Sequence, residues 1–204
     1  MTIQDSYRSI AKRSEGIYKE KGSKFIGLAF PVKDEEEIKE ILQDVRKEYF
    51  DARHHCYAWM LGADRSRYRA NDDGEPSSSA GKPILGRIES FNLSQILIIV
   101  VRYFGGTKLG VGGLITAYKS AAEDAINNAK IVERKMRQYL EINFKYPEMN
   151  AVMQIVKDDK VEQISHEFEL ECKMKIAVAL GDLEAFKKVL LAIDNVELNE
   201  LYIA

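Results

Sequence analysis

RYFGGTKLGVGGL at residues 102–114 lies between the apolar run ILIIVV at 96–101 and ITAYKSAAEDAINNA at 115–129. The pattern predicts a buried strand, a glycine-rich turn and then a helix. Main-chain N–H groups at such a helix start are free to bind an anion, and Arg102 and Lys108 place positive charge beside them. Because the stretch matches neither the Walker A pattern nor GxGxxG, it predicts an anionic partner, such as a phosphate or carboxylate, without naming one.

The glycines of this stretch have two interpretations. They can adopt positive φ or let a ligand approach the main chain, or they can serve only tight turning and close packing of the helix on the strand. They are Gly105, Gly106, Gly110, Gly112 and Gly113. Together with Tyr103, they are included among the candidate ligand-binding residues.

Length and composition indicate an ordinary globular protein of two domains. The chain has 204 residues, 46% apolar and 30% charged, which is longer than the usual single domain of about 100 to 150 residues. No apolar run approaches the roughly 20 residues that span a bilayer, and the N-terminus lacks the apolar core of a signal peptide. We therefore expect a cytoplasmic protein without a membrane partner. Cys56 and Cys172 are too few to predict a disulfide framework or a cysteine metal site.

Charge is distributed unevenly along the chain. Residues 51–119 hold nine Lys or Arg and six Asp or Glu, a net charge of +3, whereas residues 131–204 hold ten and fourteen, a net charge of −4. A protein that binds nucleic acid by phosphate neutralisation alone is usually more basic. Any contact with nucleic acid is therefore expected to be local and to involve the middle of the chain.

The first domain is predicted to span residues 1–132. Lys21-Gly22-Ser23 marks a hairpin turn, and Asp34 with Glu37 forms a capping-box-like helix start. The predicted elements are a hairpin at 14–32, a helix at 34–50, a strand at 54–61, a long polar loop at 62–81, a helix at 82–91, a strand at 95–103 and a helix that ends near 128.

The second domain is predicted to span residues 133–204. Its periodicity predicts a strand at 138–146, a helix that begins at Pro147, strands at 161–170 and 172–180, a helix capped by Gly181-Asp182, and a last strand from 196 to the end. The order β-α-β-β-α-β is ferredoxin-like. The fold class of the whole chain is therefore α+β with two domains.

Two adjacent histidines and a cysteine are candidates for chemistry. On a strand, His54 and His55 point to opposite faces, so they cannot both bind one metal ion without a bulge. One of them is expected to be structural and the other to face the cleft. His54 and Cys56 share a face, as in a thiol–imidazole dyad, but a small buried cysteine is the commoner outcome.

The loop at 62–81 is the third candidate region. Asp72, Asp73 and Glu75 could hold Mg²⁺ or Ca²⁺ through carboxylate oxygens, or form a solvated turn that Gly74 and Pro76 favour. The loop also carries Arg65, Arg67 and Arg69, whose alternation would align three guanidinium groups on an extended segment. Such a basic stripe is found both in single-stranded nucleic-acid sites and on ordinary exposed strands.

Three motifs carry a resemblance to a known family. HHCYAWMLG at 54–62, NDDGEPSSSAGKPIL at 71–85 and RYFGGTKLGVGGLITAY at 102–118 resemble, in order, the bacterial YigZ branch of the IMPACT family, and KGSKFIGLAFPV at 21–32 resembles its opening. The resemblance implies an N-terminal α/β sandwich domain, with the fold shared by a ribosomal-protein domain and GHMP kinases. It also implies a ferredoxin-like domain similar to one of elongation factor G. Eukaryotic relatives act in translational control by competing for a protein partner of a stress-activated kinase.

Residues and resemblance together favour a non-enzymatic, translation-associated regulatory protein whose central cleft binds RNA, the ribosome or another anionic partner, without a cofactor or bound metal. In this hypothesis Arg102, Lys108 and the glycine-loop amides hold the anion, and one histidine adds a hydrogen bond. The acidic residues of the 62–81 loop order the facing side. The alternatives are a phosphate-handling enzyme that uses nucleotide and Mg²⁺ on a GHMP-like fold, and a protein-interaction scaffold.

Overall fold

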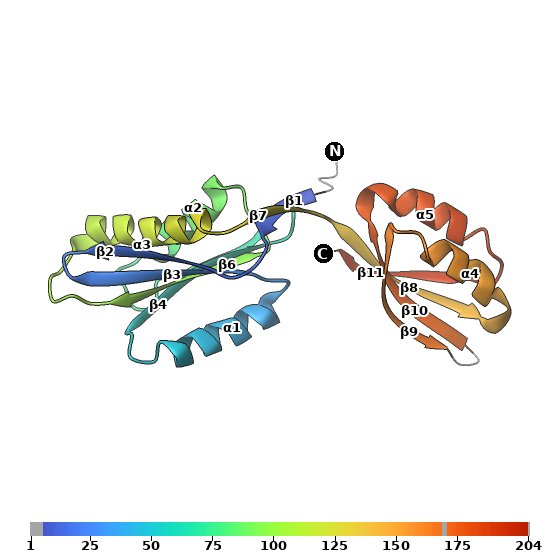
Figure 1. The fold of residues 1–204 in the computed structure, drawn as a ribbon, viewed down its shortest axis with the longest axis horizontal. Coiled ribbons are helices and arrows are strands. Elements are labelled where there is room, and N and C mark those ends of the chain that lie inside the picture. Colours follow the sequence, from blue (N-terminus) through green and yellow to red (C-terminus); the bar gives the residue numbers. More distant parts are fainter. Residues whose placement is uncertain (1–5, 169–170, 204) are drawn as a thin grey trace. The chain divides into compact units, whose positions relative to one another are not determined.

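The structure, a computed structural model, describes residues 6–168 and 171–203 (Figure 1). Contacts divide this part of the chain into two units, residues 7–134 and residues 135–203 together with Ser6. The predicted boundary after residue 132 falls inside the strand β7 (Ile131–Lys135), which pairs with β1 (Ser6–Ile10) in a small two-stranded sheet. No helix in the described ranges is long and apolar enough to cross a membrane.

The first unit is built on a five-stranded antiparallel sheet in the order β2-β3-β6-β4-β5. Helix α1 covers one face of the sheet, and α2 and α3 cover the other (Figure 1). The elements are β2 (Ser14–Glu20), β3 (Ser23–Pro31), α1 (Glu35–Glu48), β4 (His54–Leu61), β5 (Arg67–Asn71), α2 (Gly81–Ser90), β6 (Ile96–Tyr103) and α3 (Gly110–Asn127).

Local sequence explains how this unit begins. Lys21 and Gly22 have φ of 45° and 80°, the two positive values that a two-residue type I′ hairpin turn requires. The Asp34 side chain accepts a hydrogen bond from the Glu37 N–H, and the Glu37 carboxylate accepts one from the N–H of Lys33, the residue before the cap. The predicted hairpin and capped helix are therefore confirmed.

Strand β6 forms the centre of the sheet, and its apolar run supplies two cores. Ile96, Ile98 and Val100 pack with α2 and α3, whereas the alternating residues Leu97, Ile99 and Val101 pack with α1. A strand covered on both faces needs apolar residues at every position, which explains the uninterrupted run.

Three predictions for this unit need correction. The loop at 62–81 contains the edge strand β5, and the strands β1 and β7 were not predicted. Helix α3 begins at Gly110 and not near residue 115, so Gly112 and Gly113 belong to its first turn. Helix α3 as a whole packs on β2 and β3, and this tertiary packing stabilises it despite the low helix propensity of its first-turn glycines.

The second unit has a four-stranded antiparallel sheet in the order β11-β8-β10-β9, with α4 and α5 on one face (Figure 1). Its elements are β8 (Arg137–Lys145), α4 (Met149–Val156), β9 (Val161–Phe168), β10 (Glu171–Ala179), α5 (Leu183–Leu190) and β11 (Glu197–Ile203). The predicted β-α-β-β-α-β order is observed. The last two residues of the predicted strand 161–170, and Ala204, lie outside the described residues.

One predicted cap in this unit is not formed. Asp182 occupies the N-cap position of α5, but its side chain makes no capping hydrogen bond. Its carboxylate instead accepts a hydrogen bond from Lys160 Nζ at 2.8 Å. The Asp182 carboxylate therefore pairs with the Lys160 ammonium group and does not cap the helix N–H groups.

Candidate functional site

A pocket of about 860 Å³ lies where β4 begins and β6 ends, beside the first turn of α3. In the sheet, Arg102 has His54 and Phe25 as its cross-strand neighbours. Cross-strand neighbours share a face of the sheet, and this face is the one that α3 covers. We call the cavity the α3 pocket, and its lining residues are Asp51, Ala52, Arg53, His54, Glu75, Pro76, Arg102, Tyr103, Phe104, Lys108, Leu109, Gly110, Val111 and Leu114.

The α3 pocket contains part of the predicted site. The predicted residues that line it are His54, Glu75, Arg102, Tyr103, Lys108 and Gly110. The predicted residues outside its lining are His55, Asp72, Asp73, Gly105, Gly106, Gly112 and Gly113. Sequence reasoning missed Arg53, next to His54, and Phe104, although Phe104 stands inside the glycine-rich stretch. An aromatic residue between a buried strand and a polar turn is the signal that could have indicated Phe104.

Arg102 is held by a buried ion pair. Its Nη1 donates to Glu75 Oε1 at 2.5 Å, and the two side chains are only 8% and 4% exposed. The Tyr118 hydroxyl donates to the same oxygen at 2.7 Å. The Glu75 carboxylate therefore connects β6, α3 and its own segment, residues 72–75, which we call the acidic loop. It also neutralises most of the positive charge that Arg102 was expected to offer an anion.

The guanidinium of Arg102 nevertheless keeps an unsatisfied donor. Its Nε is buried and has no hydrogen-bond partner in the described part of the chain. The guanidinium carbon lies 5.4 Å from the Phe25 ring centroid and 5.6 Å from that of Phe104. A buried donor without a partner is costly, and because this nitrogen has almost no accessible surface, a ligand could bond to it only if the side chains around it moved.

The start of α3 is open to a ligand. Leu109 occupies the N-cap position, and no side chain caps the helix. A Cβ built on Gly110 or Gly112 would meet no atom within 4 Å, and Gly106 and Gly110 have φ of 89° and 71°. Leu109, Gly110 and Val111 line the pocket, and no side-chain cap is formed among the described residues, so the positive end of the helix dipole lies beside the cavity.

Gly105, in contrast to Gly110 and Gly112, is required for close packing of the main chain. A Cβ on Gly105 would lie 1.9 Å from the carbonyl carbon of Gly22, in the β2–β3 turn. The Gly105 N–H is already bonded to Ser23 Oγ at 3.1 Å. At this position the requirement for glycine comes from the close approach of two main chains, so this amide is not free for an anion.

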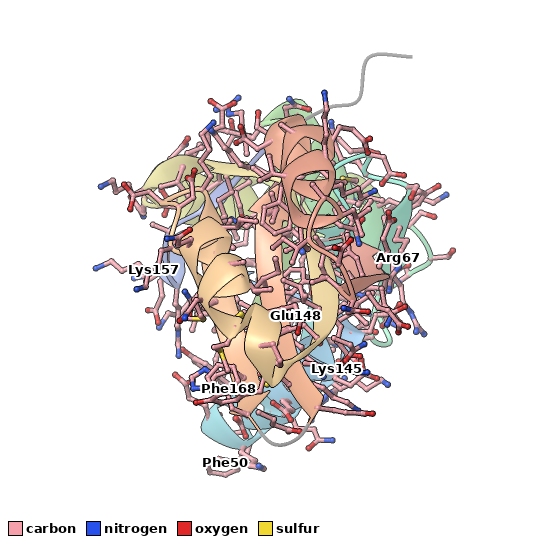
Figure 2. All side chains as sticks on the ribbon, turned by 90° about the vertical axis from the view of Figure 1, so that its right-hand side faces the viewer. Phe50, Arg67, Lys145, Glu148, Lys157 and Phe168 are labelled. Atoms are coloured by element: carbon pink, nitrogen blue, oxygen red, sulfur yellow. The ribbon has the colours of Figure 1, made fainter. Side chains whose placement is uncertain are left out.

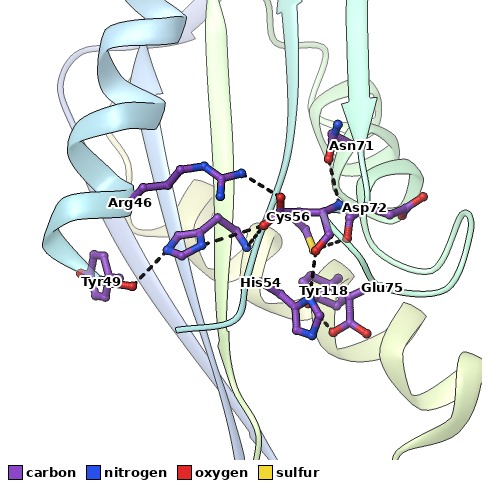
Figure 3. A network of polar contacts seen from close by, with 10 residues as sticks. Arg46, Tyr49, His54, Cys56, Asn71, Asp72, Glu75 and Tyr118 are labelled. Carbon is purple, nitrogen blue, oxygen red and sulfur yellow. Dashed lines mark hydrogen bonds and ion pairs between the residues drawn. The ribbon is translucent and has the colours of Figure 1, made fainter. Parts of the chain in front are cut away.

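Asp72, which lies beside Cys56 in Figure 3, acts as a structural carboxylate. Its oxygens accept hydrogen bonds from the N–H groups of Ser78, Ala80 and Gly81 at 2.8, 3.0 and 2.8 Å, at the start of α2. Burial acts to raise the pKa of Asp72, but these three hydrogen bonds outweigh it and hold the pKa below its usual value. The carboxylate is therefore charged and fully engaged by the main chain.

Asp73 is engaged in a similar way. It accepts from the His55 N–H at 2.7 Å and from Arg46 at 2.7 Å. Burial acts to raise its pKa, and the hydrogen bond from Arg46 does most to reverse this, so the pKa is lowered. In the described ranges no group of three or more His, Cys, Asp or Glu side chains is placed to hold a metal ion.

The two histidines lie on opposite faces of β4, as the alternation predicts. His54 Nδ1 is 2.9 Å from the Asp73 carbonyl oxygen, which can only accept, so Nδ1 carries the proton and Nε2 remains for a ligand (Figure 3). His55 is 4% exposed and lies 3.2 Å from the Tyr49 carbonyl oxygen through Nε2. Burial lowers the pKa of His55, with a further contribution from the charge of Arg46.

Cys56 and the arginines do not supply a second site. The Cys56 thiol is buried and donates to the Asp72 carbonyl oxygen at 2.9 Å, and burial raises its pKa to about 12. It is therefore a structural thiol and not half of a thiol–imidazole dyad. Arg65 donates to Asn92 at 2.5 Å and Arg67 pairs with Glu35 at 2.7 Å, so the basic stripe is largely engaged within the protein.

Comparison with known proteins gives the family. The model of the Impact N-terminal domain matches residues 21–126, which include the whole α3 pocket. The chain belongs to the IMPACT family. Among its relatives are the IMPACT family members YvyE of Bacillus subtilis (strain 168), 36% identical over 69% of this chain and 65% of that protein, and YigZ of Escherichia coli (strain K12), 29% identical over 81% and 82%.

The IMPACT-family assignment confirms the resemblance found in the three motifs. A solved structure is also similar over nearly the whole chain. A crystal structure described as that of a hypothetical protein superimposes with a TM-score of 0.79 at 26% identity, covering 98% of this chain and 99% of the other. The chain spans 65% of the length of YvyE. Neither relative is described by an activity.

Proposed function

We propose that this IMPACT-family protein is a translation-associated regulatory protein that binds RNA, free or within the ribosome, through the α3 pocket. The observation that carries the proposal is the meeting of three features in one cavity. They are the uncapped start of α3, the Nε2 of His54, whose other ring nitrogen bonds the Asp73 carbonyl oxygen, and the exposed side chains of Arg53 and Lys108. The family's link with translational control and the β-α-β-β-α-β second unit, which we assign to the ferredoxin-like folds, support it.

The charge of the pocket is compatible with a phosphate. Glu75 is paired with Arg102, and Asp51 accepts a hydrogen bond from the Tyr103 hydroxyl at 2.7 Å. Arg53 and Lys108 have no ion-pair partner in the described part of the chain, so their charges are available. The helix adds the equivalent of roughly half a positive charge at its N-terminus. Main-chain amides and a helix dipole form a phosphate site together with nearby cations.

Salt dependence tests this proposal. Single-stranded RNA contacts contribute a slope of about −0.7 per neutralised phosphate to log affinity against log salt. We expect Arg53→Gln and Lys108→Gln each to weaken RNA binding and to reduce the slope, whereas Lys119→Gln should leave both unchanged. Lys119 is a matched control because it is an exposed lysine of α3 that does not line the pocket. Fluorescence anisotropy between about 50 and 200 mM salt measures both quantities.

The other functions predicted from the sequence have distinct outcomes in the same titration. A phosphate-handling enzyme would bind a nucleoside triphosphate with Mg²⁺ at least as tightly as RNA. A protein-interaction scaffold would retain its partners after nuclease treatment and in Lys108→Gln. RNA affinity that does not change with salt, or that is equal in Lys108→Gln and the wild-type protein, would contradict the proposal.

A further inference from the structure

We infer that the RNA recognised by the α3 pocket is single-stranded, with a base stacked on the ring of Phe104 and the adjoining phosphate held at the start of α3. This inference rests on the proposed function and specifies its ligand. It begins from a feature that phosphate binding leaves unexplained, because much of the pocket lining is apolar. Phe104, Leu109, Val111 and Leu114 all line it.

Phe104 is the most accessible aromatic group in the pocket. It is 56% exposed and follows directly on β6. Val111, in the first turn of α3, is 52% exposed and lies in the same lining. A flat aromatic ring at the edge of a cationic pocket is the arrangement in which proteins stack the bases of single-stranded nucleic acids.

The Phe104 ring packs against the guanidinium of Arg102. The guanidinium of Arg102, itself buried and fixed by Glu75, lies 5.6 Å from the ring centroid. The other neighbour of the guanidinium is Phe25, which is fully buried. Phe104 is therefore the outermost member of a stack of two rings and a guanidinium whose inner members are immobilised by the core. A stacking surface fixed in this way loses little conformational entropy when a base binds.

The chemistry of the ligand follows from this combination. In a duplex the bases are stacked on one another, and a protein side chain reaches only the backbone and groove edges. A single strand presents a base face and its phosphate together. A phosphorylated peptide supplies the phosphate without the flat π face. A cavity of about 860 Å³ is also much larger than a phosphate group requires. The observations therefore favour a single-stranded nucleotide segment.

The test uses the full chain and a labelled RNA of about 12 nucleotides in three forms. These are the single strand, the same strand annealed to its complement, and an abasic strand of equal length. We expect Phe104→Ala to weaken single-strand binding about five-fold to about 150-fold, the range for loss of one stacked base. Phe104→Trp should retain the affinity. The abasic and duplex RNAs should bind more weakly to the wild-type protein, and Phe104→Ala should not weaken them further.

Phe50→Ala is the matched control. Phe50 is 82% exposed, projects away from the ribbon (Figure 2) and does not line the pocket. Phe50→Ala should bind all three RNAs as the wild-type protein does. The salt slope supplies a second readout, because Phe104→Ala should keep the slope whereas Lys108→Gln should reduce it. Circular dichroism melting curves establish that each variant is folded.

Failure of this inference can be distinguished from failure of the proposed function. Equal binding of the single strand by Phe104→Ala and the wild-type protein, with weakened binding by Lys108→Gln, would overturn base stacking and leave the phosphate site standing. A phosphoserine peptide that competes as well as the single strand would also overturn it. Absence of binding to every RNA form would refute both proposals.

Discussion

Replacement of two glycines of the 102–114 stretch by alanine should have opposite effects on stability. A Cβ on Gly105 would lie 1.9 Å from the Gly22 carbonyl carbon and 2.2 Å from the Ser23 N, whereas carbon atoms in contact are about 3.5 to 4 Å apart. The neighbouring atoms belong to the main chain, so no side chain can rotate away. The two backbones must separate by more than 1 Å, and the bond from the Gly105 N–H to Ser23 Oγ is then lost.

The expected destabilisation can be estimated from these two effects. Overpacking costs about 1 to 3 kcal/mol, and the lost hydrogen bond about 1 kcal/mol, so Gly105→Ala should lower the free energy of unfolding by about 2 to 4 kcal/mol. Gly112 is helical, and a Cβ there meets no atom within 4 Å. Because alanine is favoured over glycine in helices, Gly112→Ala should stabilise the unit by about 0.5 to 1 kcal/mol.

Urea unfolding and differential scanning calorimetry of the two variants measure these changes. If Gly105→Ala unfolds within about 0.5 kcal/mol of the wild-type protein, the assignment of Gly105 to close packing is refuted. If Gly112→Ala is destabilised, the prediction that a methyl group is accommodated at Gly112 is wrong. Because Gly112→Ala should remain folded, its RNA affinity reports separately on access to the start of α3. A stabilised variant with weakened binding would show that Gly112 serves the ligand at the expense of stability.

Three further predictions concern the buried polar groups. Glu75→Gln leaves the Arg102 charge buried without a counterion, so we expect the free energy of unfolding to fall by about 3 to 5 kcal/mol in urea titrations, and a value below about 1 kcal/mol would contradict burial of the pair. Cys56, with a pKa of about 12, should resist alkylation at mildly alkaline pH in the folded protein and react once it is unfolded; rapid labelling of the folded state would disprove the buried thiol. Because burial lowers the pKa of His55, its contribution to stability is present above the ordinary value near 6.5 and is lost as the pH falls below it. Stability should therefore decrease from about pH 7.5 to about pH 5.5 in the wild-type protein and less so in His55→Gln, and equal decreases would exclude His55 as the cause.

Elements with strong local signals could be predicted from the sequence. The turn at Lys21-Gly22 and the helix cap formed by Asp34 and Glu37 depend on residues close together in the chain, and both appear where they were expected. β5 was missed because it is a polar edge strand, held by main-chain pairing with β4. β1 and β7 were missed because their partners are more than 100 residues apart, and no local pattern specifies such pairing.

The sequence predicted several residues of the site correctly, but not which groups they contact. Alternation on β4 correctly separated the faces of His54 and His55, but it could not show which face α3 covers. The charge of Arg102 was expected to be available, and its pairing with Glu75 depends on a contact across 27 positions. Sequence reasoning also treated the carboxylates of the acidic loop as one group. In the structure each has a different partner, and only Glu75 reaches the pocket.

Glu75 makes the stability of the first unit and the shape of the α3 pocket depend on the same contacts. Its Oε1 accepts hydrogen bonds from Arg102 on β6 and from Tyr118 on α3, and Arg102 in turn supports the Phe104 ring. Loss of the carboxylate charge should therefore weaken RNA binding as well as folding. Asp72, which holds only main-chain N–H groups at the start of α2, offers the comparison. Asp72→Asn should lower stability by about 0.5 to 2 kcal/mol, as for the loss of a helix cap, while RNA affinity below the melting transition stays unchanged. Equal losses of affinity in Glu75→Gln and Asp72→Asn would show that general loosening of the unit, and not support of Phe104, connects the ion pair to binding.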